Sequence, residues 1–148
     1  MSKSAFLTSI TILLVEDDPE DVYILKKVLE RSRLRKTLYV VETGEDALRF
    51  LRRESPFEAA PRPKIILLDL RLPDISGLEV LRQVKDDPLL RPIPVIVLTN
   101  SSNQKDLVEA YDERARAFIT KPADRSDFEK VIETIEAFWL TIAKLPTD

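Results

Sequence analysis

The chain of 148 residues has no cysteine, no histidine and only two glycines. Without cysteine it can form neither a disulfide nor a thiolate metal site. Without histidine it lacks the usual zinc ligand and cannot build a Ser-His-Asp triad. Two glycines are too few for a P-loop or for the glycine fingerprint of a dinucleotide-binding fold. Any chemistry must therefore use carboxylates, hydroxyl groups, lysine or arginine.

The chain also lacks a large excess of one charge and any long apolar run. Its 23 basic and 26 acidic side chains give a formal net charge of −3, unlike the basic footprint of a nucleic-acid-binding protein. The apolar runs are far shorter than the ~20 residues that span a bilayer, and the first residues do not form a signal peptide. We therefore expect a cytoplasmic protein that binds neither nucleic acid nor membranes.

Short apolar runs alternate with longer segments in which apolar residues recur at helical spacing. The runs cover residues 10–15, 38–41, 65–68, 95–98 and 117–119. The helical segments cover residues 22–29, 47–51, 78–84, 107–111 and 128–142. This alternation predicts an α/β, flavodoxin-like (βα)5 fold, with a doubly wound parallel sheet of strand order 2-1-3-4-5. We expect one domain over residues 1–148, with a short N-terminal tail and an extended last helix.

Polar side chains follow four of the predicted strands. Glu16 and Asp17 follow the first, Asp69 ends the third, Thr99 ends the fourth and Lys121 follows the fifth. The carboxyl ends of parallel strands lie at one edge of a sheet, where ligands bind in open α/β folds, so these groups should converge there. The second strand is expected at the border of the sheet, too far out for Glu42 to join them.

Carboxylates that lie side by side repel each other unless a cation neutralises them. Oxygen ligands without histidine or cysteine favour a hard cation such as Mg²⁺, which commonly pairs with phosphate. A hydroxyl from Thr99 and an ammonium from Lys121 would complete an environment suited to a transferring phosphoryl group. Asp69 is the best candidate for the accepting carboxylate, because it ends a buried strand with donors on both sides.

Each residue also has a purely structural interpretation. Asp18 directly precedes Pro19 and is interpreted as a helix N-cap. Glu16 and Asp17 could likewise serve the start of that helix, and Asp69 alone could be an ordinary turn residue. The arrival of polar groups at four different strand ends favours the functional interpretation.

Five motifs follow one another along nearly the whole chain. They are Leu14-Val15-Glu16-Asp17-Asp18, Leu67-Leu68-Asp69-Leu70-Arg71-Leu72-Pro73, Ser76-Gly77, Val97-Leu98-Thr99 and Thr120-Lys121-Pro122. As an ordered set they resemble the receiver domain of two-component response regulators. The resemblance implies that Asp69 is the phosphoacceptor and that Asp17 binds Mg²⁺ directly. It further implies that Glu16 acts mostly through water, that the main-chain carbonyl of Arg71 is a ligand, and that Thr99 and Lys121 bind the phosphoryl oxygens.

The same resemblance implies a switch and a cis bond. Thr99 would move toward the phosphoryl group, and Phe118 would rotate inward and repack the face of the fourth predicted helix, the fifth strand and the fifth helix. Phe118 could equally be a plain core aromatic. Phe replaces the tyrosine that is frequent in the family, and Asn100 replaces a small residue, which bears on the lifetime of the phosphorylated state. The Lys121-Pro122 bond is usually cis in this family.

A narrower resemblance concerns the ends of the domain. Pro61-Arg62-Pro63, Asp87-Pro88-Leu89-Leu90-Arg91 and Phe138-Trp139-Leu140-Thr141-Ile142 are similar to segments of the single-domain regulators that partner bacterial phytochromes. This implies a sensor histidine kinase of the bacteriophytochrome type as phosphodonor. It also implies a homodimer that uses the last helix. Phe138, Trp139 and Ile142 are candidate interface residues, because they make that helix apolar over more than one face.

Alternatives from other classes stay open. A relay protein would pass the phosphoryl group on to a histidine phosphotransfer protein. A Mg²⁺-dependent aspartyl-phosphate phosphatase would need a second acid where Arg71 stands. A flavin-binding module would need a phosphate loop where the acidic residues follow the first strand. A scaffold with an inactive site would not be phosphorylated. Apart from self-catalysed phosphotransfer and dephosphorylation, we expect no enzyme activity.

Overall fold

The computed structural model describes residues 10–31, 35–99, 117–120, 133 and 137. The strands are β1 (Ile10–Val15), β2 (Lys36–Val41), β3 (Ile65–Asp69), β4 (Val95–Thr99) and β5 (Ala117–Thr120). They form one parallel sheet of order β2-β1-β3-β4-β5, which confirms the predicted topology. Four strands are longer than the apolar runs that predicted them, because polar residues extend them at one end. The extension is at the start of β2 and at the carboxyl ends of β3, β4 and β5.

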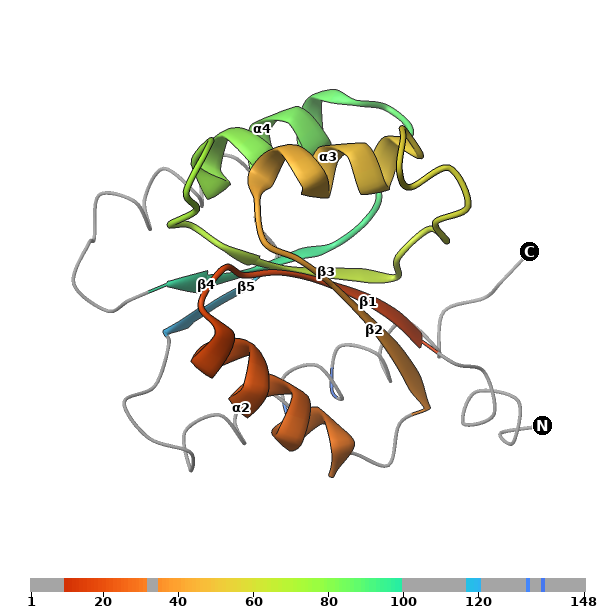
Figure 1. Ribbon diagram of the computed structural model, residues 1–148. Helices are drawn as coiled ribbons and strands as arrows, with labels where there is room; N and C mark the ends of the chain where they lie inside the picture. Colours follow the sequence, from red (N-terminus) through yellow and green to blue (C-terminus); the bar gives the residue numbers. More distant parts are fainter. Residues whose placement is uncertain (1–9, 32–34, 100–116, 121–132, 134–136, 138–148) are drawn as a thin grey trace.

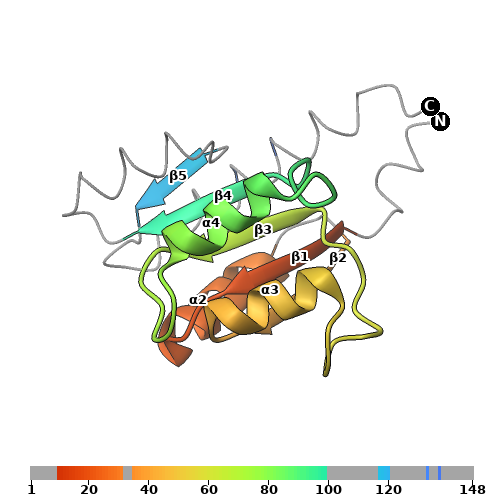
Figure 2. The same ribbon diagram turned by 90° about the horizontal axis from the view of Figure 1, so that it is seen from above.

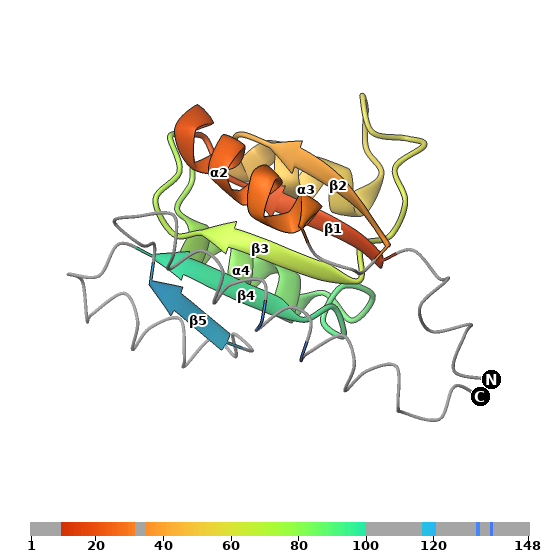
Figure 3. The same ribbon diagram turned by 90° about the horizontal axis from the view of Figure 1, so that it is seen from below.

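Helices cover both faces of the sheet (Figure 1). They are α2 (Pro19–Glu30), α3 (Gly44–Arg52) and α4 (Gly77–Asp86). Helices α3 and α4 lie over one face, seen from above in Figure 2, and α2 lies over the other, seen from below in Figure 3. Successive side chains of a strand point to opposite faces, so Leu13 and Val15 join the core under α3 and α4, whereas Ile12 and Leu14 join the core under α2.

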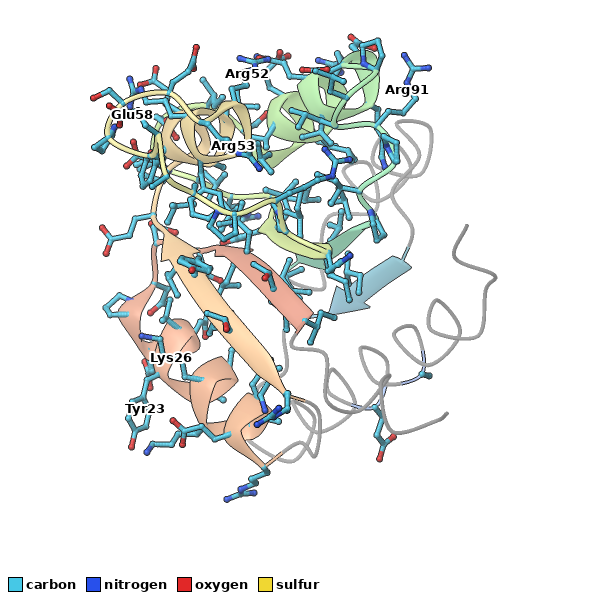
Figure 4. All side chains as sticks on the ribbon, turned by 90° about the vertical axis from the view of Figure 1, so that its right-hand side faces the viewer. Tyr23, Lys26, Arg52, Arg53, Glu58 and Arg91 are labelled. Carbon is cyan, nitrogen blue, oxygen red and sulfur yellow. The ribbon has the colours of Figure 1, made fainter. Side chains whose placement is uncertain are left out.

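Each helix begins at a side chain that satisfies a free backbone N–H. Asp18 accepts from the N–H of Glu20 over 2.9 Å, with Pro19 next to it, which confirms the predicted cap. Helix α3 is capped by Thr43 and α4 by Ser76. Outside the core, Tyr23 is 56% exposed on α2, and Lys26 of the same helix is also exposed (Figure 4).

The connection from α3 to β3 starts with a left-handed residue. Arg53 has φ 55° and ψ 40°, and its N–H closes the end of α3 by donating to the carbonyl of Phe50 over 3.3 Å. Farther along, Phe57 packs on Phe50, with ring centroids 5.5 Å apart, and Phe50 lies 5.4 Å from Tyr39 of β2. Residues 55–64, which include three prolines, contain no helix or strand.

Several predictions fall outside the described residues. They concern the helices at 107–111 and 128–142, of which only Glu133 and Ala137 are described and are helical, and the residues Asn100, Lys121, Pro122, Phe138, Trp139 and Ile142. Phe118 lies in β5, where its Cα pairs with Val97 of β4. None of the helices among the described residues has the length and hydropathy that a membrane-spanning segment requires.

Candidate functional site

The carboxyl ends of β1 and β3 bring together three acidic side chains. Val15, the last residue of β1, pairs with Leu68 of β3, so Glu16 and Asp17 emerge beside Asp69. One oxygen from each of these carboxylates lies within 4.8 Å of the others. Glu42, after the border strand β2, is not in this group. The sequence prediction therefore named the residues that the fold places together.

Burial makes this group unusual. Glu16 is completely buried and Asp69 is 4% exposed, whereas Asp17 is exposed. The N–H of Asp18 donates to Oε2 of Glu16 over 3.2 Å, and the N–H of Arg71 donates to Oδ1 of Asp69 over 3.0 Å. Burying a carboxylate is costly unless hydrogen bonds or a counter-charge compensate.

The donor set fits a divalent cation. Three carboxylate oxygens within 4.8 Å, with no nitrogen or sulfur ligand, are the chemistry that Mg²⁺ and Mn²⁺ prefer. Glu16 and Asp69 would hold the ion from the buried side, and exposed Asp17 would hold it from the solvent side. The main-chain N–H of Arg71 contacts Asp69. The role of the Arg71 carbonyl as a ligand stays a prediction.

The ends of β4 and β5 lie at the same edge of the sheet. Asp69 pairs with Leu98, and Thr99 pairs with Thr120, so the carboxyl ends of β3, β4 and β5 lie side by side. Thr99 is thus placed one residue beyond the partner of Asp69. Lys121 follows Thr120 in sequence and lies outside the described residues. The predicted convergence holds for the backbone of β4 and β5, and the contacts of Thr99 and Lys121 with a phosphoryl group stay predictions.

The loop after β3 folds back on the strand end. The N–H of Leu70 donates to the carbonyl of Leu98 over 3.2 Å, and the N–H of Gly77 donates to the carbonyl of Leu70 over 2.9 Å. A Cβ atom at position 77 would come within 2.2 Å of the Asp69 carbonyl oxygen. Ser76-Gly77 is one of the motifs that resemble the receiver family, but the sequence did not predict this contact.

Asp74, at the outer part of the same loop, was also missed. Its carboxylate accepts hydrogen bonds from the N–H groups of Gly44 and Glu45, at the start of α3. No local pattern could reveal this, because the partners lie far away in the sequence. The only available signal was an acidic residue in a short loop that must pass a helix N-terminus, where negative charge is favoured.

Comparison with known proteins agrees with this geometry. The family model described as the response regulator receiver domain matches residues 12–133. The response regulator Rcp1 of the cyanobacterium Synechocystis sp. is 40% identical over 135 residues, which cover 91% of this chain and 92% of Rcp1. The probable methanogenesis regulatory protein FilR2 of Methanothrix harundinacea is 37% identical over 131 residues, covering 87% of this chain and 83% of FilR2.

Solved structures show the same fold. The phosphorylated cyanobacterial phytochrome response regulator RcpA superposes with a TM-score of 0.86 at 39% identity, covering 95% of this chain and all of RcpA. The Mn²⁺-bound form of Rcp1 gives a TM-score of 0.84 at 39% identity, covering 93% of this chain and 99% of that structure. With this match in sequence, fold and acidic cluster, the chain belongs to the response regulator receiver domain family.

Proposed function

We propose that this chain is a stand-alone phosphorylation switch that accepts a phosphoryl group on Asp69 from the phosphohistidine of a sensor kinase. The observation that carries the proposal is the acidic group itself. A nearly buried aspartate ends β3, and its carboxylate lies within 4.8 Å of two further carboxylates. A bound cation would relieve the repulsion between the three carboxylates, and aspartate carboxylates serve as nucleophiles toward phosphorus.

The transfer exchanges one bond at phosphorus for another. A carboxylate oxygen of Asp69 attacks the phosphorus, an O–P bond forms, and the P–N bond to the donor imidazole breaks. The imidazole leaves with the electron pair of that bond. Oδ1 of Asp69 accepts the N–H of Arg71, which orients the carboxylate at the strand end. Mg²⁺ held by Glu16, Asp17 and Asp69 would neutralise the carboxylates and the phosphoryl oxygens.

The response of the protein would start at the neighbouring strands. Thr99 ends β4 next to β3, and Phe118 lies in β5. A hydroxyl from Thr99 and the ammonium of Lys121 would bind the transferred group. Movement of Thr99 would then favour an inward position of Phe118. This would alter the face that β5 is expected to form with the fourth and fifth helices predicted from the sequence. Beyond self-catalysed phosphotransfer and dephosphorylation, no turnover of a separate substrate is proposed.

The relatives suggest the partners. RcpA is described as a cyanobacterial phytochrome response regulator, and a second similar structure, 42% identical, is the bacteriophytochrome response regulator RtBRR. We therefore propose a light-sensing histidine kinase of the phytochrome type as the phosphodonor. We also propose a homodimer through the last helix, with Phe138, Trp139 and Ile142 at the interface. In this proposal the switch acts on other proteins by direct binding.

The test is phosphorylation of the purified chain with acetyl phosphate and Mg²⁺. We expect intact-protein mass spectrometry to show one added phosphoryl group that is lost in alkali, and we expect Asp69→Asn to abolish it. Asp87→Asn is the matched control, because Asp87 follows α4 and its carboxylate binds the N–H of Leu89. An unchanged mass, or a phosphoryl group on the Asp69→Asn protein, would refute the proposal.

A further inference from the structure

We propose that Asp74 is a positioning residue for the phosphorylation site: by linking the β3–α4 loop to the start of α3, its carboxylate holds Asp69 and Arg71 in the arrangement that binds the cation. This inference rests on the proposed function. Asp74 itself contacts neither the cation nor the phosphoryl group in this proposal, and it acts through the loop that joins it to Asp69.

The link consists of two hydrogen bonds, one to each oxygen of the carboxylate. The N–H of Gly44 donates to Oδ1 over 2.9 Å, and the N–H of Glu45 donates to Oδ2 over 2.8 Å. These N–H groups belong to the first turn of α3, which has no carbonyl partners for them within the helix. Thr43 satisfies a third donor of the same turn, the N–H of Asp46, over 3.0 Å. Two separate side chains thus cap one helix, and only Asp74 comes from another part of the fold.

The β3–α4 loop is also held at its two ends. The N–H of Arg71 is bonded to Asp69, and the N–H of Gly77 is bonded to the carbonyl of Leu70. Between these two anchors the chain runs outward, and Asp74 is its attachment to α3. Without Asp74, residues 72–75 would keep only side-chain packing to hold them, and the segment containing Arg71 would have more conformations available.

Packing brings the same two elements together. A Cβ atom at Gly44 would lie 2.5 Å from Cγ1 of Ile75, so the start of α3 is pressed against the residue that follows Asp74. The carboxylate can therefore reach both N–H groups at once. A shift of the loop away from α3 would have to break both hydrogen bonds, which makes the loop position depend on α3.

The charge state of Asp74 suits this role. Partial burial is the largest single influence and raises the pKa of Asp74. The hydrogen bonds from Glu45, Gly44, Ile75 and its own N–H together outweigh it, so the pKa lies below its usual value of 3.8. Asp74 is therefore ionised at neutral pH, and both bonds to α3 are charge-assisted.

The experiment compares Asp74→Ala with Thr43→Ala. Both variants remove a cap from the same end of α3, so each should lower the Tm by about 3 °C. Only Asp74→Ala removes the link to the loop. We expect it to weaken Mg²⁺ binding, measured by calorimetry on the unphosphorylated protein, by about tenfold. We also expect it to slow phosphorylation by acetyl phosphate, whereas Thr43→Ala should stay within about twofold of wild type in both assays.

Asp74→Asn covers the case in which Asp74→Ala does not fold. It keeps one acceptor oxygen and the side-chain shape, so we expect an intermediate loss of Mg²⁺ affinity. Equal Mg²⁺ affinity in wild type and the Asp74 variants would overturn the inference and leave the proposed function standing. Equal losses in Thr43→Ala and Asp74→Ala would also overturn it, because general loosening of α3 would then explain both. A wild-type protein that neither binds Mg²⁺ nor becomes phosphorylated would refute the proposed function itself.

Discussion

Gly77 lies directly against the main chain of Asp69: a Cβ atom at position 77 would come within 2.2 Å of the Asp69 carbonyl oxygen and 2.6 Å of the Leu70 Cα atom. Both atoms belong to the backbone at the end of β3, so neither can move without moving the strand end. The start of α4 can therefore approach the phosphoacceptor this closely only with a residue that has no side chain.

Gly77→Ala should thus displace the phosphoacceptor. We expect a loss of stability of about 1–3 kcal/mol, as for other overpacked sites, together with slower phosphorylation by acetyl phosphate. Chemical denaturation and mass spectrometry measure the two effects. Gly44→Ala is the comparison, since its Cβ would meet the side chains of Ile75 and Val80. If Gly77→Ala is phosphorylated at the wild-type rate, the close contact between Gly77 and Asp69 does not matter for the site.

Asp17→Asn should separate the two roles of the exposed carboxylate. Removing one of three neighbouring negative charges relieves repulsion, so the metal-free variant should be at least as stable as wild type. A cation present at 100 times its Kd stabilises the protein that binds it by about 2.7 kcal/mol. This stabilisation by Mg²⁺ should shrink in the variant, because one of the three carboxylates that would hold the ion is gone. Thermal unfolding with and without Mg²⁺ tests this, and equal Mg²⁺-induced shifts in both proteins would contradict it.

Acid should remove the contribution of Asp74 to stability. Because its pKa is lower in the folded protein than the usual 3.8, that contribution is fully present above the unfolded-state pKa and is lost as the pH falls through the lowered value. Wild type should therefore exceed Asp74→Asn in stability by a constant amount from about pH 5 to pH 7, and the difference should shrink below about pH 4. Denaturant midpoints across this range measure it. A difference that grows toward low pH would show the opposite sign.

Arg53→Gly should stabilise the protein without affecting the site. Arg53 has φ 55°, a left-handed conformation that costs about 1 kcal/mol for a residue with a Cβ atom and that glycine adopts readily. Arg52→Gly is the matched control. Arg52 is the last residue of α3, where glycine should instead destabilise by up to about 1 kcal/mol. Opposite signs in urea denaturation, with unchanged Mg²⁺ affinity, are the expected result.

The proposed dimer can be tested by truncation. Removing the residues after Phe138 takes away Trp139 and Ile142, two of the three candidate interface residues, and should weaken self-association. Sedimentation velocity at several concentrations would show a larger monomer fraction than in the full chain. An unchanged distribution would reject the interface prediction, whatever the phosphorylation state.

The sequence predicted the sheet and the acidic group because both depend on regular features. Apolar runs such as 65–68 mark buried strands, and the polar residue after each run must appear at the shared carboxyl edge, which placed Asp69 beside Asp17. The roles of Asp74 and Gly77 could not be predicted in this way. They depend on the path of an irregular loop, and the partners of Asp74 at Gly44 and Glu45 come from a different βα unit.

The position of β1 in the sheet has a consequence for how the chain folds during synthesis. β1 leaves the ribosome before both of its neighbours, β2 and β3, and Ile12 pairs with Ile65 of the later one. Until residues 65–68 emerge, a strand with an almost entirely apolar sequence has one unpaired border. Such a border invites association with other chains, so a nascent chain that stalls before β3 should depend on chaperones.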